Sequence, residues 1–313
     1  MDASDAAPAH PQTRHEIALP SAEVSYLEWA PPEAERTLLL LHGGGVDSAS
    51  LSWGGVGPEL AAAGYRVIAP DHPGYGSSPL PDWSSSQERL VGYVGEFVAA
   101  LDLGGYAVGG LSMGGGMTIG HLLDRPEKIT GAIPMGSYGF MERLGEGRFA
   151  GLLHWLTWAS VQSGFLDLAT RWYSGKRSRM DLTIKALIAD PARRDPALLD
   201  EVWQAVQSGE GSAAFSQWQK SEYGRKRAKT VYLAQLPSVT TPVLLVHGEN
   251  DPGVPVARAR LAASLLPHGR LVEVPGAAHW VQRERPDIVV PALLDFLAGL
   301  DWPAGSAVRQ PAW

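Results

Sequence analysis

Short apolar runs alternate with helical patterns along most of this chain. Six runs have the length and composition of buried strands: Thr37–Leu41, Arg66–Pro70, Tyr106–Gly109, Ile129–Pro134, Val243–Val246 and Leu271–Val274. Helical periodicity fits four segments around them: Gly57–Ala63, Gln87–Leu101, Met113–Leu123 and Pro286–Leu300. Strands that alternate with helices predict an α/β fold in which a mostly parallel, twisted sheet carries helices on both faces.

The alternation stops after Pro134 and resumes only at Val243. The segment between them has helical patterns and is rich in tryptophan, with Trp155, Trp158, Trp172, Trp203 and Trp218. Open α/β sheets bind ligands at the carboxyl edge of their strands. We therefore predict that residues 137–237 form a helical cap over that edge, and that residues 15–136 and 238–301 form the core.

Both ends of the chain are predicted to be flexible. Residues 1–14 are rich in Ala, Pro and charged side chains, and residues 302–313 are rich in Pro, Gly and Ala. Such compositions bury little apolar surface, so neither segment is expected to pack firmly.

Composition favours a globular protein that acts on a small molecule. Hydrophobic residues make up 45% of the 313 residues and charged residues 19%. The net charge of −7 gives no general attraction to a phosphate backbone, and the short basic run Arg225-Lys226-Arg227 is interpreted as a solvated helix face. No nucleic acid partner is expected. The oligomeric state is left open, with a homodimer as one alternative.

The chain contains no cysteine, which excludes disulfides, a thiolate nucleophile and cysteine-ligated metals. No His-Glu-x-x-His pair and no Walker lysine occur either, so neither zinc catalysis nor nucleotide hydrolysis has a motif. The start Met1–Asp5 lacks the basic and apolar regions of a signal peptide, and no apolar run approaches the roughly 20 residues that cross a bilayer. We predict a cytoplasmic protein without a membrane span.

The strongest local motif is Gly110-Leu111-Ser112-Met113-Gly114, which follows a predicted strand and precedes a predicted helix. A serine becomes a good nucleophile when a tight strand-to-helix turn exposes its hydroxyl, and small flanking residues relieve the crowding in that turn. The amide of Met113 would lie at a helix N-terminus, where it can stabilise negative charge. This pattern predicts Ser112 as a nucleophile.

A base and an acid follow in the order that this scaffold requires. The strand at Val243 runs into a loop that contains Asp251, and the strand at Leu271 runs into a loop that contains His279. The order Ser, Asp, His differs from that of the chymotrypsin and subtilisin arrangements. We predict that His279 is the general base and Asp251 its orienting acid, with Glu249 as the alternative acid in the same loop.

A glycine cluster follows the first predicted parallel strand, at Gly43-Gly44-Gly45. Glycines let the backbone approach a substrate closely, so Gly44 is predicted to supply the second amide of an oxyanion hole, and Gly43 and Gly45 to contact substrate. A dinucleotide-binding loop was weighed as an alternative. Ser48 stands where its third glycine belongs, and Asp71 lies later than a ribose-binding acid would.

Together these motifs resemble the α/β-hydrolase superfamily. The resemblance rests on five segments and covers residues 15–135 and 238–300: His42–Gly45, Asp71–Ser78, Gly110–Gly114, Gly248–Pro255 and Gly276–His279. It implies an α/β-hydrolase fold with a cap, and a Ser-Asp-His triad that needs no cofactor. Family members that cleave carbon–halogen bonds or epoxides place aspartate at the position of Ser112.

Within that superfamily, the triple glycine and the pair His279-Trp280 resemble hydrolases that cleave carbon–carbon bonds in ring-fission products. Two features depart from them. Leu111 stands where asparagine is common, and Ser52 and Trp53 occupy a stretch where another asparagine is expected. Leu111 cannot donate a hydrogen bond to a dienolate.

We therefore predict a serine esterase that cleaves small or medium apolar carboxylic esters through an acyl-enzyme. A carbon–carbon hydrolase, a lactonase, a cofactor-free perhydrolase and a non-catalytic ligand receptor are the alternatives. We expect Leu111 and Trp280 to contact the substrate.

Aromatic residues of the cap are candidates for an apolar roof over the substrate. They are Trp155, Trp158, Phe149 and Phe165. The apolar run Leu152–Trp158 has packing within the cap as its favoured interpretation, and contact with a lipid interface as the alternative.

Overall fold

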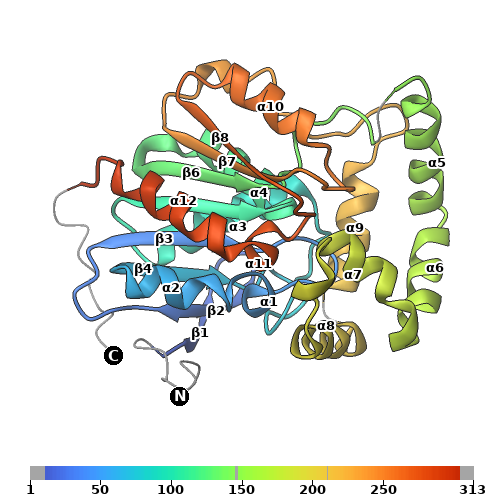
Figure 1. The fold of residues 1–313 in the computed structure, drawn as a ribbon, viewed down its shortest axis with the longest axis horizontal. Helices are drawn as coiled ribbons and strands as arrows, with labels where there is room; N and C mark the ends of the chain where they lie inside the picture. The colour runs from blue at the N-terminus through green and yellow to red at the C-terminus, as the bar shows by residue number, and fades with distance from the viewer. Residues whose placement is uncertain (1–10, 145–146, 210, 304–313) are drawn as a thin grey trace.

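A computed structural model describes residues 11–144, 147–209 and 211–303 (Figure 1). Its centre is an eight-stranded sheet with the order β1-β2-β4-β3-β5-β6-β7-β8, in which β3 to β8 are parallel and β1 and β2 are antiparallel to their neighbours. The strands are β1 Thr13–Ala18, β2 Glu23–Trp29, β3 Arg36–Leu41, β4 Tyr65–Pro70, β5 Tyr106–Leu111, β6 Ile129–Met135, β7 Val243–Gly248 and β8 Gly269–Val274.

Helices cover both faces of this sheet, which confirms the predicted fold class. One face packs against α1 Ala49–Trp53, α2 Val56–Ala62, α11 Val281–Glu284 and α12 Pro286–Ala298. The other packs against α3 Gln87–Ala100, α4 Met113–Asp124 and α10 Val256–Leu265. Strands β4, β5 and β7 are buried at every position, as both-sided coverage requires.

Five helices lie between β6 and β7, at the right-hand side of Figure 1 and beyond one end of the sheet. They are α5 Ala150–Gln162, α6 Phe165–Ser174, α7 Asp181–Leu187, α8 Pro196–Ser208 and α9 Ser212–Glu222. Four short 3-10 turns complete the described elements: Pro126–Lys128, Arg177–Arg179, Pro191–Arg193 and Leu236–Ser238. The predicted boundaries of core and cap stay a prediction, and we call helices α5 to α9 the cap below.

The sequence patterns missed the two antiparallel strands at the sheet edge. β1 alternates between exposed and half-buried positions and begins at Thr13, inside the segment predicted to be loose. β2 is almost wholly buried although it contains Glu28, because the Arg66 guanidinium donates to the Glu28 carboxylate at 2.5 Å. A carboxylate in a strand is unfavourable by propensity, and only this ion pair makes its burial acceptable.

The ends of the chain fall partly outside the described residues, namely 1–10 and 304–313, so their predicted flexibility is untested there. Trp302, however, packs against Tyr65 and donates from its indole nitrogen to Leu297 O at 3.0 Å. The start of the tail is therefore anchored. Within the described residues, no helix has both the length and the apolar composition needed to cross a bilayer.

Candidate active site

Ser112 forms the turn between β5 and α4. Its backbone has φ 55° and ψ −113°, a left-handed conformation that L-residues rarely adopt and that stores strain. A side chain at Gly110 or Gly114 would overlap backbone oxygens of the same turn or of β3, so both positions need glycine. The Ser112 amide donates to Met135 O at 2.8 Å, and its carbonyl accepts from Tyr138 N at 2.9 Å. The neighbouring strand thus holds the strained turn in place.

His279 and Asp251 meet at the ends of β8 and β7. The Asp251 carboxylate accepts a hydrogen bond from His279 Nδ1 at 2.7 Å through Oδ2, and from the amides of Gly253 and Val254 at 2.8 and 3.0 Å through Oδ1. Its side chain is fully buried, whereas the His279 side chain is 15% exposed. Glu249 instead accepts from the amide of Gly276 at 3.2 Å and is exposed. The structure therefore brings Asp251 and not Glu249 to the imidazole.

Charge fixes the protonation of this pair. Burial alone would raise the pKa of Asp251, but the charge and hydrogen bond of His279 hold that pKa below its usual value. For His279, burial lowers the pKa, and the nearby Asp251 and Asp47 carboxylates outweigh burial and raise it. Asp251 is therefore ionised at neutral pH, and the imidazole is a stronger base than a free histidine.

The loop after β3 faces the same space as the triad residues. Gly43, Gly44 and Gly45 line one cavity together with Ser112 and His279. Gly45 has φ 77°, and a side chain at Gly44 would overlap the ring of Phe215, a residue of α9. The Met113 amide starts α4, where the helix dipole favours negative charge. These backbone groups can act as an oxyanion hole.

A buried carboxylate that the sequence patterns did not single out supports this loop. Asp47 accepts from Gly43 N at 2.7 Å, from Ser48 N at 2.8 Å, and from Ser52 Oγ at 2.8 and 3.0 Å. No cation is among these donors, and burial raises the pKa of Asp47 to about 7. The signal in the sequence is an acidic residue two positions after the glycines, which was considered only as part of a nucleotide-binding loop.

Two histidines lock the glycine loop to the loop after β4. His42 Nε2 accepts from His72 N at 2.9 Å, the two rings stack at 3.8 Å, and the His72 ring contacts His42 O at 2.9 Å. Burial lowers the pKa of His42 to about 3, so it stays neutral and can accept this hydrogen bond. His42 and His72 therefore have a supporting role, and His279 is the histidine that lines the cavity.

The cavity has a volume of about 640 Å³ and two kinds of wall. Its apolar wall consists of Leu166, Met180, Leu187, Val202, Val206, Phe215 and Trp280. Its polar wall, from α6, α7 and α9, consists of Asp167, Thr170, Thr183, Ser216, Gln219 and Lys220. Lys220 Nζ lies 3.1 Å from Asp167 Oδ2. A mainly apolar substrate with one polar end fits such a cavity.

Three predicted contacts differ from the structure, whereas Trp280 does line the cavity. Trp155 and Trp158 lie on α5, outside the cavity lining, and the Trp155 side chain is 43% exposed. The other roof candidates, Phe149 and Phe165, are 59% and 65% exposed. Leu111 is fully buried in the core beneath the glycine loop, because it is the last residue of an inner strand. α5 lies on the outer side of the cap, so its tryptophans do not reach the substrate space.

Comparison with known proteins places these features in a family. The family described as alpha/beta hydrolase fold matches residues 36–286. A 2-hydroxy-6-oxo-6-(2'-aminophenyl)hexa-2,4-dienoic acid hydrolase from Metapseudomonas resinovorans is 27% identical over 281 residues, which cover 88% of each chain.

Two solved structures share the architecture. A serine hydrolase involved in carbazole degradation has a TM-score of 0.72 and 25% identity, over 92% of this chain and 99% of that one. A thermophilic esterase from Thermogutta terrifontis has a TM-score of 0.71 and 20% identity, over 91% of this chain and 98% of that one.

Proposed function

This chain belongs to the α/β hydrolase fold family, and from that premise we propose that it is a serine hydrolase with Ser112 as nucleophile, His279 as general base and Asp251 as orienting acid. The observation that carries the proposal is the 2.7 Å contact between His279 Nδ1 and the buried Asp251 carboxylate, beside the cavity that Ser112 lines. A carboxylate that holds Nδ1–H leaves Nε2 as the proton acceptor.

In the proposed reaction, Ser112 Oγ attacks a carbonyl carbon while His279 Nε2 takes the hydroxyl proton. The carbonyl oxygen becomes an oxyanion, which accepts hydrogen bonds from the amides of Met113 and Gly44. Asp251 stays ionised and stabilises the imidazolium. His279 then protonates the leaving group, and water releases the acyl group from Ser112 by the same route.

For the bond that is cleaved, we propose a carbon–carbon bond of a 2-hydroxy-6-oxo-dienoate that carries an apolar 6-substituent. This differs from the sequence-based preference for esters. The change rests on relatives named as hydrolases of such dienoates, one of which aligns with 88% of this chain. The apolar wall suits the 6-substituent, and Lys220 on the polar wall offers a cation to the carboxylate.

The carbon–carbon reaction makes a demand that ester hydrolysis does not. The dienol must first become a ketone, so that the departing carbon leaves as a stabilised enolate, which takes a proton. An ester releases an alkoxide directly. Ester cleavage is therefore the second candidate, and two observations favour it: Leu111 is apolar and buried, and the Lys220 ammonium is already paired with Asp167.

The nucleophile is tested by treatment with a fluorophosphonate and measurement of the intact mass. The native protein should gain one adduct, and Ser112→Ala should gain none. Ser137→Ala is the matched control, because Ser137 is buried close to the same turn and donates to Tyr138 O at 2.8 Å. An adduct on Ser112→Ala would refute the assignment.

The substrate class is tested by comparing kcat/KM for a 2-hydroxy-6-oxo-dienoate with kcat/KM for short nitrophenyl esters on one preparation. A preference of about tenfold for the dienoate, or about 1.4 kcal/mol in the transition state, supports carbon–carbon cleavage. The same preference for the ester promotes the second candidate.

Two variants sharpen the comparison. Lys220→Met should lower kcat/KM for the anionic dienoate by about tenfold, the effect of losing one partly exposed charged hydrogen bond, and should spare the neutral ester. Asp167→Asn should raise it for the dienoate by removing a negative charge beside the Lys220 ammonium. Equal effects of Lys220→Met on both substrates would argue against a carboxylate at this position.

A further inference from the structure

The outer side of the cap exposes a concentration of apolar side chains. Of the ten large hydrophobic residues that are exposed in the described part of the chain, eight lie on or directly before α5 and α6: Phe149, Leu152, Leu153, Trp155, Leu156, Phe165, Leu168 and Trp172. Their exposed fractions run from 43% to 67%. We call this set the α5–α6 face. A patch of this kind on a folded protein marks an interaction surface.

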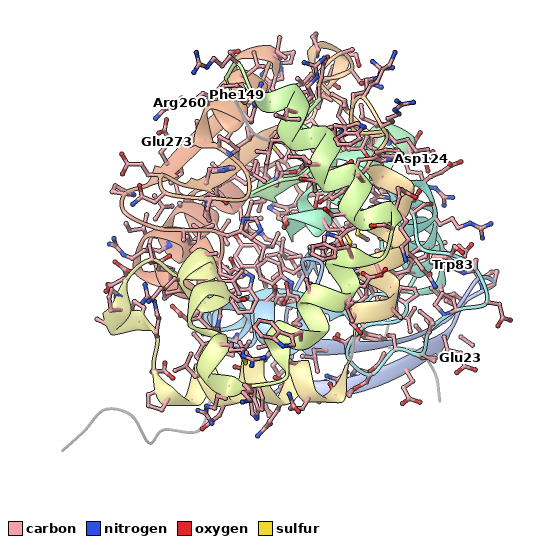
Figure 2. All side chains as sticks on the ribbon, turned by 90° about the vertical axis from the view of Figure 1, so that its right-hand side faces the viewer. Glu23, Trp83, Asp124, Phe149, Arg260 and Glu273 are labelled. Carbon is pink, nitrogen blue, oxygen red and sulfur yellow. The ribbon has the colours of Figure 1, made fainter. Side chains whose placement is uncertain are left out.

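The position of the face leaves it open to a large partner. Figure 2 shows α5 and α6 running across the front of the molecule, with Phe149 near the upper end of α5. α5 packs against α6 and α9, which lie on its inner side. Leu166 and Thr170, also on α6, line the cavity. The α5–α6 face is thus one helix away from the substrate space.

Arginines border the apolar residues of this face. The Arg148 guanidinium lies 4.5 Å from the centre of the Phe149 ring, and that of Arg179 lies 3.9 Å from the Trp172 ring. A third, Arg225, lies 6.0 Å from the ring of Trp158, in the middle of α5. Aromatic rings beside cationic groups are typical of surfaces that enter the boundary between lipid headgroups and acyl chains.

The charge of the whole chain is divided in the same direction. Residues 137–237 contain fourteen Lys and Arg against ten Asp and Glu, whereas the rest of the chain contains twelve against twenty-three. A net positive cap on a net negative protein orients the molecule toward a negative surface with the α5–α6 face first.

These observations separate two occupants of the face. A second copy of this chain, packed face to face, would bring the bordering arginines of both copies together without acidic partners, and like charges in an interface are costly. A layer of anionic lipid offers a negative charge to each arginine and hydrocarbon to each leucine and aromatic ring. We propose that the α5–α6 face binds the surface of a membrane that contains anionic phospholipid, without spanning it.

The test is co-sedimentation of the full-length protein with vesicles of phosphatidylcholine alone, or with about 30% phosphatidylglycerol added. The native protein should pellet with the anionic vesicles and lose binding at high salt. Leu156→Asp and Leu168→Asp should each lower the partition coefficient by about tenfold or more, because each puts a carboxylate into the apolar contact. Leu261→Asp is the matched control, since Leu261 is 40% exposed but lies on α10.

A charge variant makes the result independent of the apolar substitutions. Arg225→Glu should weaken binding to anionic vesicles, whereas Arg89→Glu should not, although Arg89 also faces a tryptophan, at 5.7 Å from the Trp83 ring. Equal binding to both kinds of vesicle, equal losses in Leu156→Asp and Leu261→Asp, or no binding at all would each overturn the proposal. So would a solution dimer that Leu156→Asp dissociates, because a second copy would then cover the face.

Discussion

Asp47 should make the stability of this protein fall as pH rises, which is unusual for an aspartate. In the folded protein, burial raises its pKa to about 7, whereas an unfolded aspartate has a pKa of about 3.9. Between these values the folded state binds more protons than the unfolded state, so the free energy of unfolding decreases with rising pH. At about 1.4 kcal/mol per pKa unit, the decrease amounts to about 4 kcal/mol between pH 4 and pH 7.

The variant Asp47→Asn isolates this effect from that of other titrating groups. An asparagine has one acceptor oxygen, so it can serve the amide of Gly43 or that of Ser48 but not both. Leaving one buried amide unpaired costs about 1–3 kcal/mol at any pH. The variant should therefore be less stable than the native protein at pH 5, and equal to it or more stable at pH 8, where native Asp47 is ionised.

The measurement is urea unfolding of both proteins at pH 5 and pH 8, with urea preferred because it does not screen charges. The difference in unfolding free energy between the two proteins should change by several kcal/mol between these pH values. A second readout is the pH–rate profile. The Asp47 charge raises the pKa of His279, so the acidic limb of the profile should move to lower pH in Asp47→Asn. A stability difference that is the same at both pH values would refute the reasoning.

Three further predictions concern the triad and the oxyanion loop. Asp251→Asn should lower turnover by about four orders of magnitude, and Glu249→Gln by far less, in steady-state kinetics; the reverse order would make Glu249 the acid. In the native protein, kcat/KM should fall as pH drops through the raised pKa of His279, since an imidazolium cannot accept the serine proton; a flat profile down to about pH 4 would contradict its role as base. Gly44→Ala should lose activity because its methyl group would overlap the Phe215 ring, and the additional change Phe215→Ala should restore part of it; no recovery in the double variant would show that the loss has another cause.

The parallel strands and the meeting of Asp251 with His279 could be predicted because they depend on local patterns. A strand that is buried on both faces has to be a continuous apolar run, as in Val243–Val246, and residues that follow parallel strands gather at one edge of the sheet. The edge strands could not be predicted in this way. The buried position of Glu28 in β2 depends on an ion pair with Arg66, which is distant in sequence.

The support of the glycine loop depends on contacts that a single motif does not encode. Asp47 and Ser52 look like ordinary loop residues until the fold buries them together and turns both toward the amide of Gly43. Phe215 follows the glycines by about 170 residues, yet its ring packs over Gly44. A long chain separation hides such contacts, because sequence spacing carries no information on which helix of the cap covers which loop.

The cap shows why apolar composition alone does not locate a pocket. The tryptophans of α5 were assigned to a roof over the substrate, on the premise that an apolar helix is covered on its apolar side. The structure instead covers α5 only on the side of α6 and α9, and leaves Trp155 43% exposed. Phe215 on α9 closes over the substrate space from within. The cap therefore has two apolar surfaces that the sequence does not distinguish, an inner one for a small molecule and an outer one, the α5–α6 face, for a larger partner.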